Sequence, residues 1–317
     1  MKYIQTLREG DQVGEIYLCK KKQTFMTKNG KPYDNVILQD KTGQLNGKIW
    51  DVNSGGIEEF DSLDYVYVMG DITIFQGAPQ LNIRRVRKVH DGEYDPADYL
   101  PVSDKDIPQM YRQVMDLIDS IKNPYLKRIT GVFFENDIFE RKFKQHSAAK
   151  SVHHGFVGGL LEHTLSVAEN CDFFAKQYPM LNRDLLVSAA LLHDIGKLWE
   201  LSSFPRNDYT DEGQLLGHIM IGATKISNQI DQIEGFPHTL RNELLHCILA
   251  HHGELEYGSP KKPALAEALA LSFADNLDAK METFREAFAN VQENCLEWQG
   301  FNRFLDSNIR RTGMPEA

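Results

Sequence analysis

The chain has 317 residues, 42% of them hydrophobic, enough for two domains with substantial cores. Its mean hydropathy is -0.41, and no apolar run approaches the roughly 18 residues of a membrane-spanning helix. The start of the chain lacks an apolar core and a small-residue cleavage site, so we expect no signal peptide. Four scattered cysteines without a Cys-x-x-Cys pair argue against a thiolate zinc site and predict a cytoplasmic location.

The net charge of -10 is unevenly distributed along the chain. Residues 1–90 hold 13 Lys and Arg against 11 Asp and Glu, a net charge of +2, whereas the remainder holds 22 against 34, a net charge of -12. The acidic total argues against a nucleic-acid partner, but this asymmetry leaves the first part of the chain able to bind one.

Residues 1–90 carry strand signals. The expected strands cover residues 13–20, 35–39, 44–50, 65–75 and 80–86, with a short helix expected over 57–63. Turn residues such as Asn29-Gly30 separate them. Five strands with a helix between the third and the fourth resemble an OB-fold, a five-stranded barrel that binds single-stranded nucleic acids or oligosaccharides.

Basic and aromatic side chains share the regions where OB-folds bind ligands. The cations cluster in the first-to-second strand connection and on the last strand, and Phe25, Tyr33 and an outward-facing Trp50 on the third strand would supply stacking surfaces. The alternative is that the cations form a solvated face and the rings pack internally. We predict a single-strand interface from eight side chains, namely Lys20, Lys22, Phe25, Tyr33, Lys48, Trp50, Arg84 and Arg85.

Residues 91–107 contain Gly, Pro and five Asp without periodicity, and we expect them to link two domains. From residue 108 to 317 the apolar spacing is helical, which predicts an all-helical second domain. Helices are expected over residues 110–122, 124–135, 160–177, 183–198, 217–233, 240–251 and 263–284.

The helical part contains a spaced series of histidines and aspartates. Most of them lie on or beside apolar helical runs, where an unpaired polar group is costly to bury. Imidazole and carboxylate bind divalent transition metals without a thiolate. We therefore predict a divalent-metal site formed by His163, His193, Asp194, His218, His251, His252 and Asp275.

His193 and Asp194 end the apolar run 185–192, so the helix that carries them is central. An isolated His-Asp pair is better explained by a buried hydrogen bond, but the further candidate ligands favour a metal. Lys197 lies four residues after His193 and therefore on the same helical face. A cation there suits a phosphate oxygen or a leaving group, and the alternative is a surface lysine.

This set resembles the HD phosphohydrolase superfamily, an all-helical fold named for its His-Asp pair, over about residues 150–285. The resemblance implies that His163, His193, Asp194 and Asp275 bind one metal. Members with two metals have three more histidines, which match His218, His251 and His252, and Asp194 would then bridge both ions.

An OB-fold followed by an HD domain, with the motif KSVHHGFVGGLLEH at residues 150–163, resembles the YhaM family of bacterial 3′→5′ exoribonucleases over nearly the full chain. The resemblance implies an enzyme that prefers Mn²⁺, with Fe, Co or other divalent ions as alternatives, and that trims single-stranded RNA and often single-stranded DNA. Asp194 and Lys197 would be the catalytic residues. His153 and His154 are candidates for contacts with substrate phosphates.

Two other functions stay open. One is an HD hydrolase of small nucleotides or cyclic dinucleotides, although the Gly-Tyr-Pro signature of one such branch does not follow His251-His252. The other is a non-catalytic single-strand-binding protein, against which the complete ligand set argues. We expect no membrane partner, and the sequence leaves a homo-oligomer open.

Overall fold

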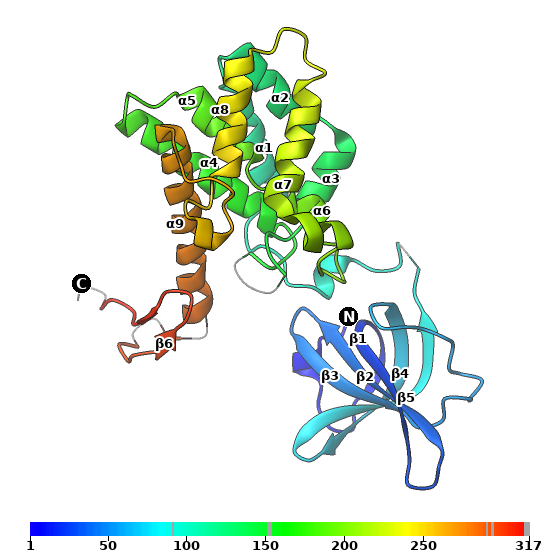
Figure 1. The fold of residues 1–317 in the computed structure, drawn as a ribbon. Helices are drawn as coiled ribbons and strands as arrows, with labels where there is room; N and C mark the ends of the chain where they lie inside the picture. Colours follow the sequence, from blue (N-terminus) through cyan, green and yellow to red (C-terminus); the bar gives the residue numbers. More distant parts are fainter. Residues whose placement is uncertain (91, 151–153, 290, 293–294, 314–317) are drawn as a thin grey trace. The chain divides into compact units, whose positions relative to one another are not determined.

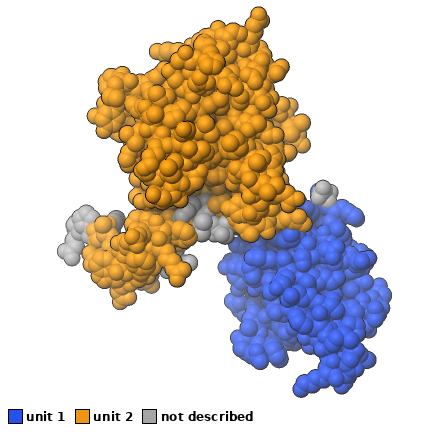
Figure 2. Space-filling view, in the orientation of Figure 1, with its two compact units in different colours: residues 1–102 blue, residues 103–317 orange. Residues whose placement is uncertain are grey.

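The structure is a computed structural model that describes residues 1–90, 92–150, 154–289, 291–292 and 295–313. The chain divides into two compact units, Met1–Val102 and Ser103–Ala317, which are coloured separately in Figure 2. The division falls inside the stretch 91–107 that the sequence predicts as a linker. Tyr94 and Tyr99 from this stretch pack against Tyr65 with ring centroids 3.8 and 5.2 Å away, so part of the stretch belongs to the first unit.

The first unit is a closed five-stranded barrel with the strand order β1-β2-β3-β5-β4 (Figure 1). Its strands are β1 (Gln12–Met26), β2 (Pro32–Asp40), β3 (Gly43–Ile49), β4 (Tyr65–Phe75) and β5 (Ala78–Lys88). β1 pairs with both β2 and β4, and a register shift between Cys19 and Lys21 lets it bend from one to the other. The parallel pairing of β3 with β5 closes the barrel. The predicted five-stranded OB-type barrel is therefore confirmed.

The prediction of a helix over residues 57–63 is wrong. Ile57 forms a parallel bridge with Val86, and the backbone of Leu63 donates a hydrogen bond to the carbonyl of Cys19. The segment thus pairs with residues distant in sequence instead of with itself, and Phe60 is buried in the barrel core. Local apolar spacing cannot reveal such long-range pairing.

The second unit contains a bundle of helices, as predicted (Figure 1). Its helices are α1 (Ile107–Asp119), α2 (Pro124–Phe134), α3 (Asp137–Gln145), α4 (Gly159–Gln177), α5 (Arg183–Leu192), α6 (Lys197–Glu200), α7 (Asp211–Ile230), α8 (His238–Leu249) and α9 (Ala266–Phe288). Side chains of Asp106, Asn123 and Asn182 cap α1, α2 and α5. None of the described helices is long and apolar enough to cross a membrane.

α5 is the central helix of this bundle, because every residue from Leu185 to Leu192 is buried. It packs against α2, α4, α8 and α9, whose apolar side chains fill the interior of the unit. A short hairpin, β6 (Phe301–Asn302) and β7 (Ser307–Asn308), follows α9, where no strand was expected.

The segment 183–198 is not one helix, as the sequence predicted, but α5, a turn and α6. Gly196 lies in this turn against the backbone of α7, where an added Cβ would be 2.0 Å from the carbonyl oxygen of His218. α7 itself is kinked at Gly217, whose φ of +70° favours glycine. Gly196 therefore lets the His-Asp turn approach α7 closely at His218, and Gly217 lets α7 kink directly before His218.

Candidate metal centre and single-strand interface

The structure brings together all seven predicted metal ligands. His163 comes from α4, His193 and Asp194 from the turn after α5, and the others from α7, from the turn after α8 and from α9. Four overlapping groups in the described chain could hold a metal ion, and three of them consist of predicted ligands only: His163 with His193 and Asp275; His193 with Asp194 and His251; His218 with His251 and His252. Residues that span more than a hundred positions therefore meet at one place.

Asp194 lies between two groups of histidines. Its Oδ2 atom is 3.4 Å from Nε2 of both His163 and His193. Its Oδ1 atom faces the other way, 3.5 Å from Nε2 of His218 and 3.7 Å from Nε2 of His251. Each carboxylate oxygen thus faces a different pair of imidazole nitrogens.

Three buried atoms of this cluster make no hydrogen bond to any described residue. They are Oδ1 of Asp194 and Nε2 of His218 and His251, and they converge on one point. An unpaired buried polar atom typically costs about 1–3 kcal/mol. Imidazole nitrogens and a carboxylate oxygen together are donors suited to a divalent transition metal, so these residues fit such an ion.

The imidazole rings are oriented by hydrogen bonds on the side away from the cluster. In each case Nδ1 contacts an acceptor, which assigns the proton to Nδ1 and leaves Nε2 free to coordinate. Two acceptors are carboxylates that the sequence analysis missed: Asp278 for His163, at 2.7 Å, and Glu200 for His218, at 3.0 Å. The carbonyls of Ala190, Ile248 and Tyr257 accept from His193, His251 and His252.

Lys197 faces the cluster, as its spacing predicted, with Nζ 2.7 Å from Oδ2 of Asp194. Burial opposes charge on both groups, yet their mutual attraction prevails. It lowers the pKa of Asp194 well below its usual value and raises the pKa of Lys197. A carboxylate and an ammonium group therefore coexist at the site.

The cluster opens to a cavity of about 300 Å³, lined among others by His154, His163, Lys197 and His252. His154 is buried with an unusual φ of +60°, and its Nε2 is 3.0 Å from Oδ2 of Asp278. Its Nδ1 atom has no hydrogen-bond partner in the described part of the chain. His153, the other candidate for phosphate contacts, lies outside the described residues.

On the barrel, four of the eight predicted interface residues form one row across β1, β2 and the end of β3. Tyr33 stacks between Phe25 and Trp50, with ring centroids 5.9 and 5.1 Å apart. Nζ of Lys48 lies 5.2 Å from the centroid of the Tyr33 ring. Phe25 is 44% exposed and Trp50 is 51% exposed, so their rings are accessible. We call the three stacked rings, together with Lys48 beside them, the aromatic row.

The other four predicted interface residues lie outside the aromatic row. Nζ of Lys22 binds the Phe60 carbonyl at 2.9 Å and lies over the Phe60 ring, so it is engaged within the barrel. Lys20 is exposed. Arg84 and Arg85 line a separate cavity of about 580 Å³, and Arg84 forms an ion pair with Asp71. Exposed apolar residues that the sequence analysis missed are Met26, Ile74 and Phe75.

Comparisons with known proteins agree with this architecture. A family model described as HD domain matches residues 160–280. The 3'-5' exoribonuclease YhaM of Geobacillus sp. (strain WCH70) is 38% identical over 284 residues, 89% of this chain and 87% of the relative. The protein of the same name from Bacillus subtilis (strain 168) is 36% identical over 288 residues, 89% of this chain and 90% of the relative.

Among solved structures, the second OB-fold domain of replication protein A from Methanococcus maripaludis matches 29% of this chain and 98% of that chain, with 16% identity and a TM-score of 0.22. At this score the barrel assignment depends on the strand order alone. The family of the whole chain is instead established by the sequence identity of 36–38% over about nine-tenths of its length. The chain belongs to the YhaM family, as its motifs predicted.

Proposed function

We propose that this protein is a metal-dependent 3′→5′ exoribonuclease. It hydrolyses phosphodiester bonds of single-stranded RNA, and of single-stranded DNA as a second substrate, and releases nucleoside 5′-monophosphates. The observation that supports this most is the position of Asp194 between two groups of imidazole nitrogens, with three buried donor atoms unpaired. Relatives over nearly the whole chain carry the name 3'-5' exoribonuclease.

The proposed metal is Mn²⁺, with Fe, Co or another divalent ion as alternatives. One ion would be held by His163, His193, Asp194 and Asp275, and a second by Asp194, His218, His251 and His252. When bound, such ions supply Lewis-acid polarisation of the scissile phosphate and lower the pKa of a coordinated water.

The protein's own groups prepare the site for a phosphodiester. Lys197 holds its ammonium group at the cavity wall, where it can stabilise negative charge on a phosphate oxygen or on the departing 3′ oxygen. Asp194 stays ionised because Lys197 and His193 stabilise its negative charge. The hydrogen bonds on Nδ1 keep the imidazole rings in one orientation, so little reorganisation accompanies substrate binding.

The barrel would hold the upstream part of the strand. The aromatic row offers successive ring faces on which bases stack without sequence preference, and Lys48 adds a positive charge for the backbone. The +2 charge of residues 1–90 gives a polyanion a part of the chain that does not repel it, in contrast to the -12 of the remainder. The free thiols of the four cysteines support a cytoplasmic location.

A direct test follows single-stranded RNA labelled at either end, with Mn²⁺ and with chelator. We expect the 5′ label to move into progressively shorter RNAs and the 3′ label to appear at once in a mononucleotide. The chelator should prevent both the shortening of the 5′-labelled RNA and the release of the 3′-labelled mononucleotide. Hydrolysis of small nucleotides but not RNA would favour the alternative HD hydrolase, and binding without metal-dependent cleavage would favour a non-catalytic binding protein.

A further inference from the structure

We propose that Tyr257 and Asn276 form a subsite for the terminal nucleotide of the strand. The Tyr257 ring stacks on its base, and the Asn276 amide binds the hydroxyl groups of its ribose. This inference rests on the proposed exonuclease function, because only an enzyme that acts on a chain end needs to recognise a terminal nucleotide.

Both residues line the cavity to which the ligand cluster opens. The same cavity of about 300 Å³ is lined by His163, Lys197 and Asp275, so a group bound beside Tyr257 and Asn276 lies next to the proposed chemistry. Ligand sites are concave and combine an apolar surface with a few polar groups that fix orientation. An aromatic ring and an amide on one cavity match this combination.

Tyr257 is held in place by its backbone while its ring stays exposed. The Tyr257 carbonyl accepts a hydrogen bond from Nδ1 of His252 at 2.8 Å, and its N–H donates to the carbonyl of Glu254 at 3.1 Å. Its side chain is nevertheless 67% exposed. The backbone thus fixes where the side chain starts, and the exposed ring at the cavity edge is available to stack on a nucleobase.

Asn276 lies on α9 directly after Asp275. Its neighbours Asp275 and Asp278 are engaged with His163, whereas the Asn276 amide has no hydrogen-bond partner in the described chain and is exposed at the cavity. A carboxamide offers both donors and an acceptor, and so can pair with a hydroxyl in either direction. The 2′-hydroxyl is the group that distinguishes RNA from DNA. Asn276 is therefore suited to favour a ribose over a deoxyribose.

The stacking role is tested with 5′-labelled RNAs that differ only in whether the last nucleotide has a base. For the native protein, loss of this base should lower kcat/KM about tenfold, in the range of stacking on an aromatic side chain. Tyr257→Ala should show this loss on normal RNA and almost no further loss on the abasic RNA. Tyr257→Phe should behave like the native protein. Tyr178→Ala is the matched control, since Tyr178 is also exposed but follows the C-terminal end of α4, whereas His163 lies in the first turns of that helix.

The ribose role is tested with RNAs whose last nucleotide is either ribose or 2′-deoxyribose. The native protein should prefer ribose about three- to tenfold, the effect of one hydrogen bond. Asn276→Ala should abolish the preference, while Asn228→Ala, an exposed asparagine on α7, should retain it. Dissociation constants of the same RNAs, measured with chelator, should shift in parallel and so report binding apart from turnover.

The two possible failures are distinguishable. Suppose that the native protein shortens the RNAs, but that an abasic end lowers kcat/KM of Tyr257→Ala, and a deoxyribose end that of Asn276→Ala, as much as in the native protein. The subsite is then refuted and the exonuclease function stands. If the native protein releases no nucleotide from any RNA, the proposed function itself is refuted. Unchanged thermal unfolding and Mn²⁺ binding of the variants exclude a general loss of structure.

Discussion

The carboxylate of Asp278 accepts a hydrogen bond from Nδ1 of His163 at 2.7 Å, and this bond decides which ring nitrogen faces the other candidate metal ligands. A neutral imidazole has one N–H, so donation through Nδ1 leaves Nε2 as the coordinating atom. Asp278 also contacts Nε2 of His154 and accepts from the hydroxyl of Ser166. Burial acts to raise the pKa of Asp278, but the hydrogen bonds from His154 and His163 lower it by more. The carboxylate therefore stays ionised.

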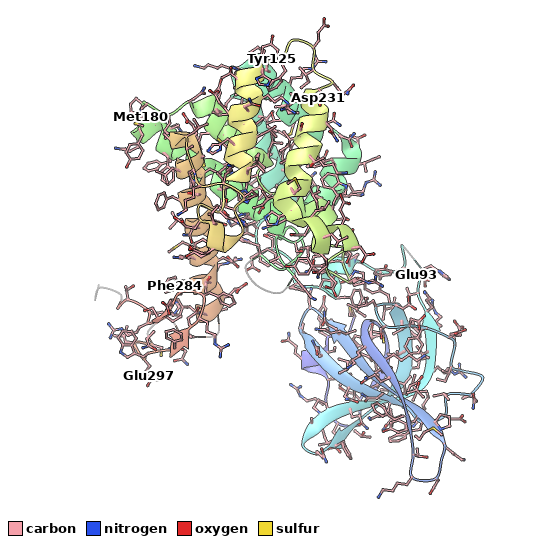
Figure 3. All side chains as sticks on the ribbon, in the orientation of Figure 1. Glu93, Tyr125, Met180, Asp231, Phe284 and Glu297 are labelled. Atoms are coloured by element: carbon pink, nitrogen blue, oxygen red, sulfur yellow. The ribbon has the colours of Figure 1, made fainter. Side chains whose placement is uncertain are left out.

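We expect Asp278→Ala to weaken Mn²⁺ binding by about 10- to 100-fold, because the ring of His163 loses its fixed orientation. Isothermal titration calorimetry of metal-free protein measures this change. Asp231→Ala is the control, since Asp231 is an exposed carboxylate just past the end of α7, labelled in Figure 3. Equal Mn²⁺ affinity of Asp278→Ala and native protein would show that another contact orients His163.

His193→Ala and Asp194→Ala should abolish hydrolysis while single-strand binding remains. The ligand cluster lies in the unit Ser103–Ala317, whereas the aromatic row lies in the unit Met1–Val102. Asp194→Ala should be the more severe change, because Asp194 contacts both groups of histidines. Turnover in Mn²⁺-replete buffer and fluorescence anisotropy of labelled RNA measure the two properties. Near-native turnover of either variant would place the active site elsewhere.

Trp50→Ala should weaken the binding of single-stranded RNA by about 1–3 kcal/mol, the usual contribution of one stacked base. The expected cause is loss of one end of the aromatic row, where Trp50 stacks on Tyr33. Anisotropy titrations in chelator measure the dissociation constant. Trp298→Ala is the matched control, because Trp298 is also exposed but belongs to the segment after α9. An equal effect of both substitutions would refute a specific role for the aromatic row.

Gly196→Ala should destabilise the protein by about 1–3 kcal/mol, the usual effect of overpacking. The new Cβ would lie 2.0 Å from the backbone oxygen of His218, so the His-Asp turn or α7 must move. Gly222→Ala on the facing helix is the control, since its Cβ would meet nothing closer than 3.4 Å. Gly196→Ala should lower both the melting temperature and the Mn²⁺ affinity, whereas Gly222→Ala should lower neither. Similar melting temperatures of the two variants would contradict this packing argument.

The ligand series could be predicted from the sequence because its residue types are unusual where they occur. His193 and Asp194 directly follow the buried, mostly apolar run 185–192, and such groups are rarely buried without a partner. Asp278 and Glu200 gave no comparable signal, since a single acidic residue on a helix usually faces solvent. Their roles depend on contacts with His163 and His218 across the fold.

The fold could be predicted where the hydrophobic period was long and regular, as in β4 and α4. α3 was missed although Phe139 and Phe143, both buried, have helical spacing, because the rest of this helix is polar except for the exposed Ile138. The expected helix at 57–63 failed for the opposite reason, since its apolar residues serve the barrel through Ile57 and Phe60. Spacing reports which face is apolar but not which partner covers it.

The number of metal ions gives the sharpest test of the site. Nδ1 of His218 contacts Glu200, while its Nε2 and that of His251 are buried and unpaired beside Oδ1 of Asp194. These donors are separate from the group formed by His163, His193 and Asp275, so we expect a second ion bound through them.

Protein saturated with Mn²⁺ and then desalted should contain two ions per chain, and His218→Ala should contain one. Anomalous diffraction from crystals soaked in Mn²⁺ covers the case in which the weaker ion is lost on desalting. The alternative is one tightly held ion, with His218, His251 and His252 contacting substrate phosphate. A single anomalous peak at His163, His193, Asp194 and Asp275 in concentrated Mn²⁺ would establish that alternative and refute the two-ion site.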